Sequence, residues 1–446
     1  DPVSGPFSIT VTFTESVTGF ELDDLTVGNG TPSNLSGSGD SYTAEITPSG
    51  DGTVTVDIAA GVAQDAAGNA NTAATQFSIE SDGTAPEVTI TTASADPVSG
   101  AFTVEVTFSE SVTGFTVDDL TVGNGAAGSF SGSGDSYSAE ITPSSDGTVT
   151  VDVAAGVAQD AAGNDNTAAS QFSIESDGSA PGVEITTASS DPVSGAFTVD
   201  IAFSEAVSGF SVDDLTVSNG TAGSFTGSGD SYSAEITPDS DGTVTVDIAA
   251  GVAQDAAGND NTAATQFSIE SDGSAPSVEI TTASSDPVSG AFSITVTFTE
   301  SVTGFELGDL TVGNGSAGSF TGSGDTYTAD ITPSGDGTVT VDVAAGVAQD
   351  SAGNDNTAAT QFSIESDGSA PGVSLSTASS DPVSGAFTVD ITFTEAVTGF
   401  TVDDLTVGNG TPSNFSGSGD TYTTDITPSG DGAVTVDIAA GVAQDA

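Results

Sequence analysis

The stretch that decides the fold is Ala158-Gln-Asp-Ala-Ala-Gly-Asn-Asp-Asn166, followed after a short segment by Glu175-Ser-Asp-Gly-Ser-Ala-Pro181. The first part is rich in carboxylates and in residues that favour turns, and the second is an acidic run that ends in proline. The same combination recurs over Asp65–Pro86, Asp255–Pro276 and Asp350–Pro371. We interpret it as the end of one small β-domain and the joint to the next.

The joints belong to an internal repeat of constant length. The pentapeptide Asp-Pro-Val-Ser-Gly recurs every 95 residues, beginning at Asp1, Asp96, Asp191, Asp286 and Asp381. This unit is too long for a solenoid repeat and suits a β-sandwich of about 100 residues. The predicted modules are 1–84, 85–179, 180–274, 275–369 and 370–446. We expect the first to lack its first strand, the last to lack its last strand, and the chain to be an excerpt from a longer array.

Alternating apolar residues predict the strands of each module. In the second module the apolar residues alternate with Ser, Thr and acidic residues over 88–90, 102–108, 137–141, 149–153 and 172–174. Residues 115–122 are also expected to be extended, and Asp146-Gly147 is a typical hairpin turn. Seven short strands with turns between them favour an antiparallel Greek-key sandwich.

The aromatic residues fit the core of such a sandwich. All 23 Phe fall in five columns of the repeat, those of Phe7, Phe13, Phe20, Phe77 and Phe130, and all five Tyr fall in the column of Tyr42. Each column suits an inward position, and the chain has no Trp. No aromatic residue is left over for a platform on which a sugar could stack.

The charge of the chain restricts its partners. It contains 64 Asp and Glu residues and no Lys, Arg or His, which gives a formal charge of −64. We expect no nucleic-acid partner, because phosphate binding needs Lys and Arg. Membrane insertion is not expected either, since no apolar run approaches the roughly 18 residues of a span. Each carboxylate must be solvated, protonated or neutralised by a cation from outside the chain.

The missing residue types argue against an enzyme. Without Cys there is no disulfide or thiolate metal site, and without His, Cys or Lys the common general bases and nucleophiles are absent. Paired carboxylates could hydrolyse glycosides. Five near-identical copies with their aromatic residues in the core leave no specialised cleft for such a substrate.

Several motifs resemble the bacterial immunoglobulin-like domains of giant surface adhesins. They are Phe108-Ser-Glu-Ser-Val-Thr-Gly-Phe115, Asp119-Leu-Thr-Val122, Asp160-Ala-Ala-Gly-Asn164 and Ala180-Pro181. The resemblance covers the whole chain five times over. It implies an all-β fold of tandem antiparallel Greek-key (Ig-like) β-sandwiches in an extended rod. It also implies an extender region, often stiffened by Ca²⁺, outside a bacterial cell at its surface or in its matrix.

The five copies separate the acidic columns. The column of Thr10, Glu105, Asp200, Thr295 and Asp390 drifts, as expected for a solvated strand face. Other columns stay acidic in every copy, and among them we interpret those of Asp40, Asp51 and Asp57 as structural.

The remaining acidic columns converge at one pole of the sandwich. In a Greek-key sandwich the loops after the second and sixth strands lie at the pole where the preceding linker enters. Ca²⁺ takes six to eight hard oxygen ligands, whereas softer metals prefer the His and Cys that are absent. The predicted metal ligands are Glu15, Asp24, Asp65, Asn69, Glu80, Asp82, Glu110, Asp119, Asp160, Asn164, Glu175, Asp177, Glu205, Asp214, Asp255, Asn259, Glu270, Asp272, Glu300, Asp309, Asp350, Asn354, Glu365, Asp367, Glu395, Asp404 and Asp445.

These observations lead to one functional hypothesis and two alternatives. The hypothesis is a stalk segment of a secreted bacterial adhesin or surface fibre, rigidified by Ca²⁺ at its joints and continued by further copies of the repeat. At ~3.3 Å per strand residue, each module should span roughly 40 Å and five should form a rod of about 200 Å. One alternative is a self-assembling filament or biofilm-matrix protein whose fibres pack laterally against other copies. The other is a polysaccharide-binding module.

Overall fold

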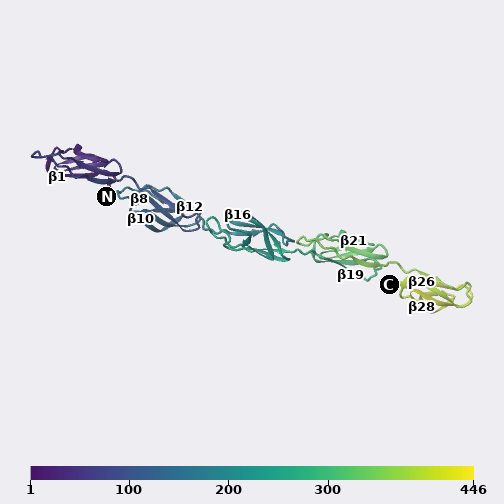
Figure 1. The fold of residues 1–446 in the computed structure, drawn as a ribbon. Helices are drawn as coiled ribbons and strands as arrows, with labels where there is room; N and C mark the ends of the chain where they lie inside the picture. The colour runs from purple at the N-terminus through teal and green to yellow at the C-terminus, as the bar shows by residue number, and fades with distance from the viewer. Residues whose placement is uncertain (1, 446) are drawn as a thin grey trace.

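The computed structural model describes residues 2–445 and shows β-sandwiches that follow one another in a line from the N-terminal to the C-terminal module (Figure 1). These residues form five separate clusters of buried apolar side chains, one for each sandwich. All strand pairs in the named sheets are antiparallel. The predicted all-β rod of tandem antiparallel sandwiches is confirmed.

The second module shows the complete arrangement. One sheet has the order β10-β8-β7, and its strands are β7 (Val88–Thr92), β8 (Phe102–Val112) and β10 (Gly125–Pro143). The other has the order β12-β11-β9, and its strands are β9 (Leu120–Gly123), β11 (Gly147–Val153) and β12 (Phe172–Ser176). A short 3₁₀ helix, η2 (Val117–Asp119), leads from the first sheet into the second.

The other modules repeat this order. The third contains β13 (Val183–Thr186), β14 (Phe197–Val207), η3 (Val212–Asp214), β15 (Leu215–Ser218), β16 (Gly220–Pro238), β17 (Gly242–Ile248) and β18 (Phe267–Ser271). The fourth contains β19 (Val278–Thr282), β20 (Phe292–Val302), η4 (Leu307–Asp309), β21 (Leu310–Gly313), β22 (Gly315–Pro333), β23 (Gly337–Val343) and β24 (Phe362–Ser366).

The two outer modules differ from the inner three in the strands that make up their sheets. The first contains β1 (Phe7–Thr18), η1 (Leu22–Asp24), β2 (Leu25–Gly28), β3 (Gly30–Pro48), β4 (Gly52–Ile58), β5 (Gln64–Asp65) and β6 (Phe77–Ser81). The fifth contains β25 (Val373–Ser376), β26 (Phe387–Val397), η5 (Val402–Asp404), β27 (Leu405–Gly408), β28 (Gly410–Pro428) and β29 (Thr435–Ile438). Over residues 2–445, sheet β3-β1-β5 has no counterpart of β7, and sheet β27-β29 has two strands.

The core lies between the two sheets of each module, where the alternating pattern places its apolar residues. Val104, Val106, Ile141, Val149 and Val151 are fully buried in the second module. Burying each such side chain contributes about 1.5–3 kcal/mol. The polar residues between them face solvent, so each strand has one side in the core and one side towards solvent.

The aromatic residues form a compact group in the core. The ring of Tyr137 lies 5.9 Å from Phe108, 5.1 Å from Phe115 and 5.7 Å from Phe130, and its hydroxyl donates to the Val112 carbonyl at 3.3 Å. Phe77 departs from the predicted core position, because its side chain is 45% exposed. It belongs to the module whose sheet has no counterpart of β7.

Two segments differ from the expected short strands. Element β10 is 19 residues long and doubles back on itself, as shown by Ser129 Oγ donating to Glu140 at 2.8 Å and Ser131 contacting Ser138 at 3.0 Å. Residues 115–119 do not continue as a strand but turn into η2. The reason is local, because the Asp119 carboxylate accepts a hydrogen bond from the Thr116 backbone N–H and stabilises the turn.

Candidate metal centre at each joint

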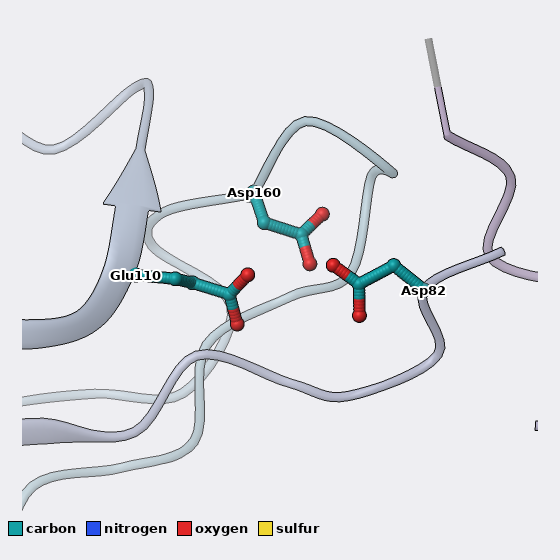
Figure 2. Close-up of side chains that lie close together, drawn as sticks. All are labelled: Asp82, Glu110 and Asp160. Carbon is teal, nitrogen blue, oxygen red and sulfur yellow. The ribbon is translucent and has the colours of Figure 1, made fainter. Parts of the chain in front are cut away.

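Three carboxylates meet where one module ends and the next begins. Asp82 lies in the linker, Glu110 near the end of β8, and Asp160 in the loop between β11 and β12. One oxygen of each carboxylate lies within 4.8 Å of the other two, and Figure 2 shows the three side chains pointing toward one another. The following joints repeat the arrangement with Asp177, Glu205 and Asp255, with Asp272, Glu300 and Asp350, and with Asp367, Glu395 and Asp445. We call each group a joint triad.

The turn sequence around Asp160 explains how its carboxylate is held. Oδ1 accepts hydrogen bonds from the backbone N–H groups of Ala162 at 2.8 Å and Asn164 at 2.9 Å, and Oδ2 accepts from Asn164 Nδ2 at 2.8 Å. Gly163 completes the turn with a φ of 86°, which glycine adopts without strain. Asp160 is only 6% exposed. Each carboxylate oxygen has two lone pairs, so these bonds leave acceptor capacity for a ligand.

Asp82 is held by both modules that it connects. Its N–H donates to the Val3 carbonyl of the first module at 3.0 Å. Its own carbonyl accepts from Asn164 Nδ2 of the second module at 2.8 Å. Its carboxylate accepts from the Thr84 N–H at 3.1 Å, which forms a local turn in the linker. Hydrogen bonds from both modules therefore hold Asp82 in place without an ion.

The electrostatics of the joint are unfavourable for the chain alone. Burial raises the pKa of Glu110, and the neighbouring charges of Asp82, Asp160 and Asp51 raise it further. The pKa values of Glu205, Glu300 and Glu395 are raised by burial and by the equivalent neighbours. The sequence contains no Lys, Arg or His that could offset these charges. A cation from outside would therefore stabilise the ionised triad.

The chemistry of the triad fits a hard divalent cation. It supplies carboxylate oxygens alone, which suit Ca²⁺ or Mg²⁺, and no imidazole or thiolate that would select a softer metal. Asp82, Glu110 and Asp160 would hold such an ion at the first joint.

The predicted metal ligands in the column of Asp119 contact their own turn and not the joint triads. The Asp119 carboxylate accepts hydrogen bonds from Thr116 N at 2.7 Å and Thr116 Oγ1 at 2.9 Å. Its equivalents also accept a backbone N–H three residues earlier, at 2.7–2.8 Å. Within the described residues, the joint triads do not include this column, whose members are Asp24, Asp119, Asp214, Asp309 and Asp404.

The Glu of the last strand also lies outside the triads. Glu175 accepts a hydrogen bond from Thr148 Oγ1 at 2.6 Å, across the pair of strands β11 and β12. The same distance is found in the other copies, where Glu80 pairs with Thr53, Glu270 with Thr243 and Glu365 with Thr338. Side chains alternate along a strand, so this position faces the outside of the sheet.

The predicted Asn ligands lie at the joint, where their side-chain nitrogen atoms donate hydrogen bonds to the linker. Asn164, Asn259 and Asn354 donate Nδ2 to the carbonyls of Asp82, Asp177 and Asp272 at 2.7–2.8 Å. The same nitrogen donates to the Asp of its own turn in each case. These residues therefore tie the linker to the next module.

The first module has the same turn. Its predicted residues Glu15, Asp65 and Asn69 line one hollow, together with residues of β1 and the segment 70–74. Asp65 accepts from Asn69 Nδ2 at 2.7 Å, which reproduces the turn of Asp160.

Asp51 also lies at the joint, although the sequence pattern predicts only a structural role for it. Asp51, in the turn between β3 and β4, accepts hydrogen bonds from the Gly83 N–H at 2.7 Å and from the Thr84 hydroxyl. These bonds lower the pKa of Asp51, with the Thr84 hydroxyl as the largest contributor. Its acidity in every copy was the available signal, but an Asp-Gly turn explains that signal equally well.

Over residues 2–445 the protein has no helix that is long and apolar enough to cross a membrane.

Comparison with known proteins identifies the repeated unit. The model of the family described as "Bacterial Ig-like domain" matches residues 3–80, 82–175, 177–270, 272–365 and 367–446. No curated protein sequence matches the chain. Solved structures similar to it include invasin, a bacterial integrin-binding protein, at 13% identity with a TM-score of 0.33, covering 84% of this chain and 80% of invasin.

A second similar structure is a tetra-tandem repeat in the extending region of a large adhesion protein. It has 19% identity and a TM-score of 0.29, and the match covers 83% of this chain and 97% of that one. Neither description, nor that of the family, names an enzyme. The chain belongs to the bacterial Ig-like domain family, of which it contains five copies in tandem.

Proposed function

We propose that this chain is an extender segment of a bacterial cell-surface adhesin or fibre, located outside the cell and rigidified by Ca²⁺ at its joints. Its unit is the module with the limits given by the repeat, 1–84, 85–179, 180–274, 275–369 and 370–446. The observation that carries the proposal is the recurrence of a joint triad at each of four joints, the first of which is drawn in Figure 2, along a linear array of sandwiches (Figure 1).

The ligands of each triad come from both sides of a joint, which couples ion binding to the relative position of two modules. Asp82 belongs to the linker that leaves the first module, whereas Glu110 and Asp160 belong to the second. When bound, the ion would supply the positive charge that the chain lacks. Without it, the three carboxylates repel one another and favour a wider or more mobile joint.

The proposal is tested by small-angle X-ray scattering of the whole chain with Ca²⁺ and after its removal by a chelator. With Ca²⁺ we expect a maximum dimension of about 200 Å, set by strand length and module number. After chelation the maximum dimension should fall and the melting temperature should drop. An unchanged length and melting temperature would count against the proposal.

A pair of matched variants locates the effect. Replacing Glu110, Glu205, Glu300 and Glu395 by Gln removes one ligand from every joint triad and should weaken Ca²⁺ binding measured by calorimetry. Replacing Glu80, Glu175, Glu270 and Glu365 by Gln removes the same number of charges from the outer faces of the sheets. If both variants lose Ca²⁺ binding equally, binding is a general effect of charge and the joint is not the site.

A further inference from the structure

We propose that Asp51, Asp146, Asp241 and Asp336 are positioning residues that bind each outgoing linker to the module it leaves, and so aim the linker carboxylate at the next module. We call this contact the linker clasp. Its effect on ion binding rests on the proposed function above, whereas its effect on the direction of the linker needs no ion.

The clasp uses both oxygens of the carboxylate. Asp146 Oδ1 accepts from the Gly178 N–H at 2.7 Å, and Oδ2 accepts from the Ser179 hydroxyl at 2.5 Å. Asp241 binds Gly273 at 2.6 Å and Ser274 at 2.5 Å in the same way. Asp336 binds Gly368 at 2.8 Å and Ser369 at 2.5 Å. Hydrogen bonds to an ionised carboxylate are stronger than those between neutral groups.

A comparison of the four joints shows which chemical group of the linker clasp is present in every copy. The hydroxyl comes from Thr84 at the first joint and from Ser179, Ser274 and Ser369 at the others. The methyl group of Thr is therefore dispensable, and the hydroxyl that donates to the carboxylate is present at all four joints.

The clasp is distinct from the turn on which its carboxylate lies. At the first joint, Asn29 holds the turn through its Nδ2, which donates to the Gly50 carbonyl at 3.0 Å, and through its carbonyl, which accepts from the Ser49 N–H at 3.0 Å. Gly52 supplies the positive φ of 115° that the turn needs. The Asp51 carboxylate contributes instead to a contact 32 residues along the chain. Removing it should leave the turn in place.

The clasp acts on the residue next to the ion ligand. Asp82 directly precedes Gly83, whose N–H the clasp binds. On the other side of the joint, Asn164 binds the Asp82 carbonyl at 2.8 Å and the Thr167 N–H donates to the Pro86 carbonyl at 2.9 Å. The linker is thus fastened to the module behind it by the clasp and to the module ahead by these two contacts. These contacts limit how far the linker can swing, and the proposed ion would limit it further.

The test compares three variants of the whole chain. In the first, Asp51, Asp146, Asp241 and Asp336 are replaced by Ala; in the second, the same four are replaced by Asn, which keeps an oxygen acceptor for the glycine N–H. The control replaces Asp40, Asp135, Asp230 and Asp325 by Ala, which removes four equal charges from a column that is not in the joint triads. Circular dichroism and the melting temperature verify that the modules stay folded.

In metal-free buffer we expect the Ala variant to scatter as a shorter and more flexible particle than the parent chain. The Asn variant should lie closer to the parent, and the control should match it. In Ca²⁺ titrations the Ala variant should bind about tenfold more weakly, as when a residue that orients a metal ligand is lost. A purely structural role within the module would lower the melting temperature without these changes.

The outcomes separate the clasp from the proposed function. If the parent chain binds no Ca²⁺ but the Ala variant bends in metal-free buffer, the clasp stands and the Ca²⁺ proposal falls. If the Ala variant keeps the parental dimension, the clasp is overturned. It is also overturned if the Ala and Asn variants both become longer and bind Ca²⁺ more tightly, because Asp51 would then act only as a repelling charge.

Discussion

At the scale of single residues, the joint contains carboxylates whose pKa values are shifted in opposite directions. The pKa of Glu110 is raised by burial and by Asp82 and Asp160, while the pKa of Asp51 is lowered by Thr84 and Gly83. A raised pKa means that the folded joint binds a proton more tightly than the unfolded chain does. Stability from this group is present at low pH and is lost as pH rises through the raised pKa. The lowered pKa of Asp51 has the opposite sign, and its stability is lost as pH falls through that value.

The first prediction concerns this pH dependence in the absence of metal. Lowering the pH from 7 to about 5 should raise the melting temperature of the metal-free chain, because ordinary carboxylates with pKa values of about 3.9–4.3 take up few protons in this window. Groups with raised pKa values take up more protons there than ordinary carboxylates do. Replacing Glu110, Glu205, Glu300 and Glu395 by Gln should flatten the profile. A parent chain whose melting temperature is constant or falls over this window would contradict the interpretation.

At the scale of elements, the doubling back of β10 depends on a glycine. Gly132 has a φ of 123°, and a Cβ there would lie 2.4 Å from the Ser136 carbonyl oxygen and 2.5 Å from the Tyr137 Cα. Both are backbone atoms and cannot move aside cheaply. Tyr137 is also the residue around which the aromatic group packs. The bend of the hairpin and the position of the aromatic core are therefore coupled.

We predict that Gly132→Ala destabilises the second module by about 1–3 kcal/mol, the usual cost of a residue held in a sparsely populated backbone region. Differential scanning calorimetry should show one transition moving to lower temperature. Gly128→Ala is the matched control in the same element, because a Cβ at Gly128 would meet nothing within 4 Å. Equal effects of the two changes would exclude the proposed steric cause.

At the scale of the whole molecule, the rod is a series of separate sandwiches joined by short linkers (Figure 1), and hydrogen bonds hold these linkers in place. Each of the five apolar clusters draws its buried residues from a single module. Within the described residues no buried apolar cluster spans two modules, and hydrogen bonds such as that of Asn164 to the Asp82 carbonyl cross the joint. We therefore expect an apolar defect in one module to stay within that module. Alignment is then decided at the joints and stability within the modules.

This separation predicts a local response to a core mutation. Ile236→Ala removes a fully buried side chain from the third module and should destabilise it by about 2–5 kcal/mol. The transitions of the other four modules should stay where they are. Thr237→Ala, at the next and exposed position, is the control and should change little. A melting curve that moves as one unit would show that the modules unfold together.

Most of the fold could be predicted from the sequence, because the alternation of apolar and polar residues is a local pattern that recurs in every copy of the repeat. The alternation of Val104, Val106 and Phe108 with polar residues predicted a half-buried strand, and the repeat predicted a linear array of such sandwiches. Residues 115–119 were misread as extended because apolar spacing does not report a capping contact such as that of Asp119 with Thr116.

The candidate metal site at the joints could be predicted from the sequence only in part. Composition alone determined that any charge balance at the joints has to come from outside the chain, since the protein has 64 acidic residues and no basic ones. Three-dimensional structure decided which carboxylates face one another, bringing Asp82, Glu110 and Asp160 together and directing Asp119 and Glu175 to other partners. The reason is physical: these residues are brought together by folding across a module boundary, and the direction of a side chain depends on its backbone and hydrogen bonds rather than on its place in a repeat.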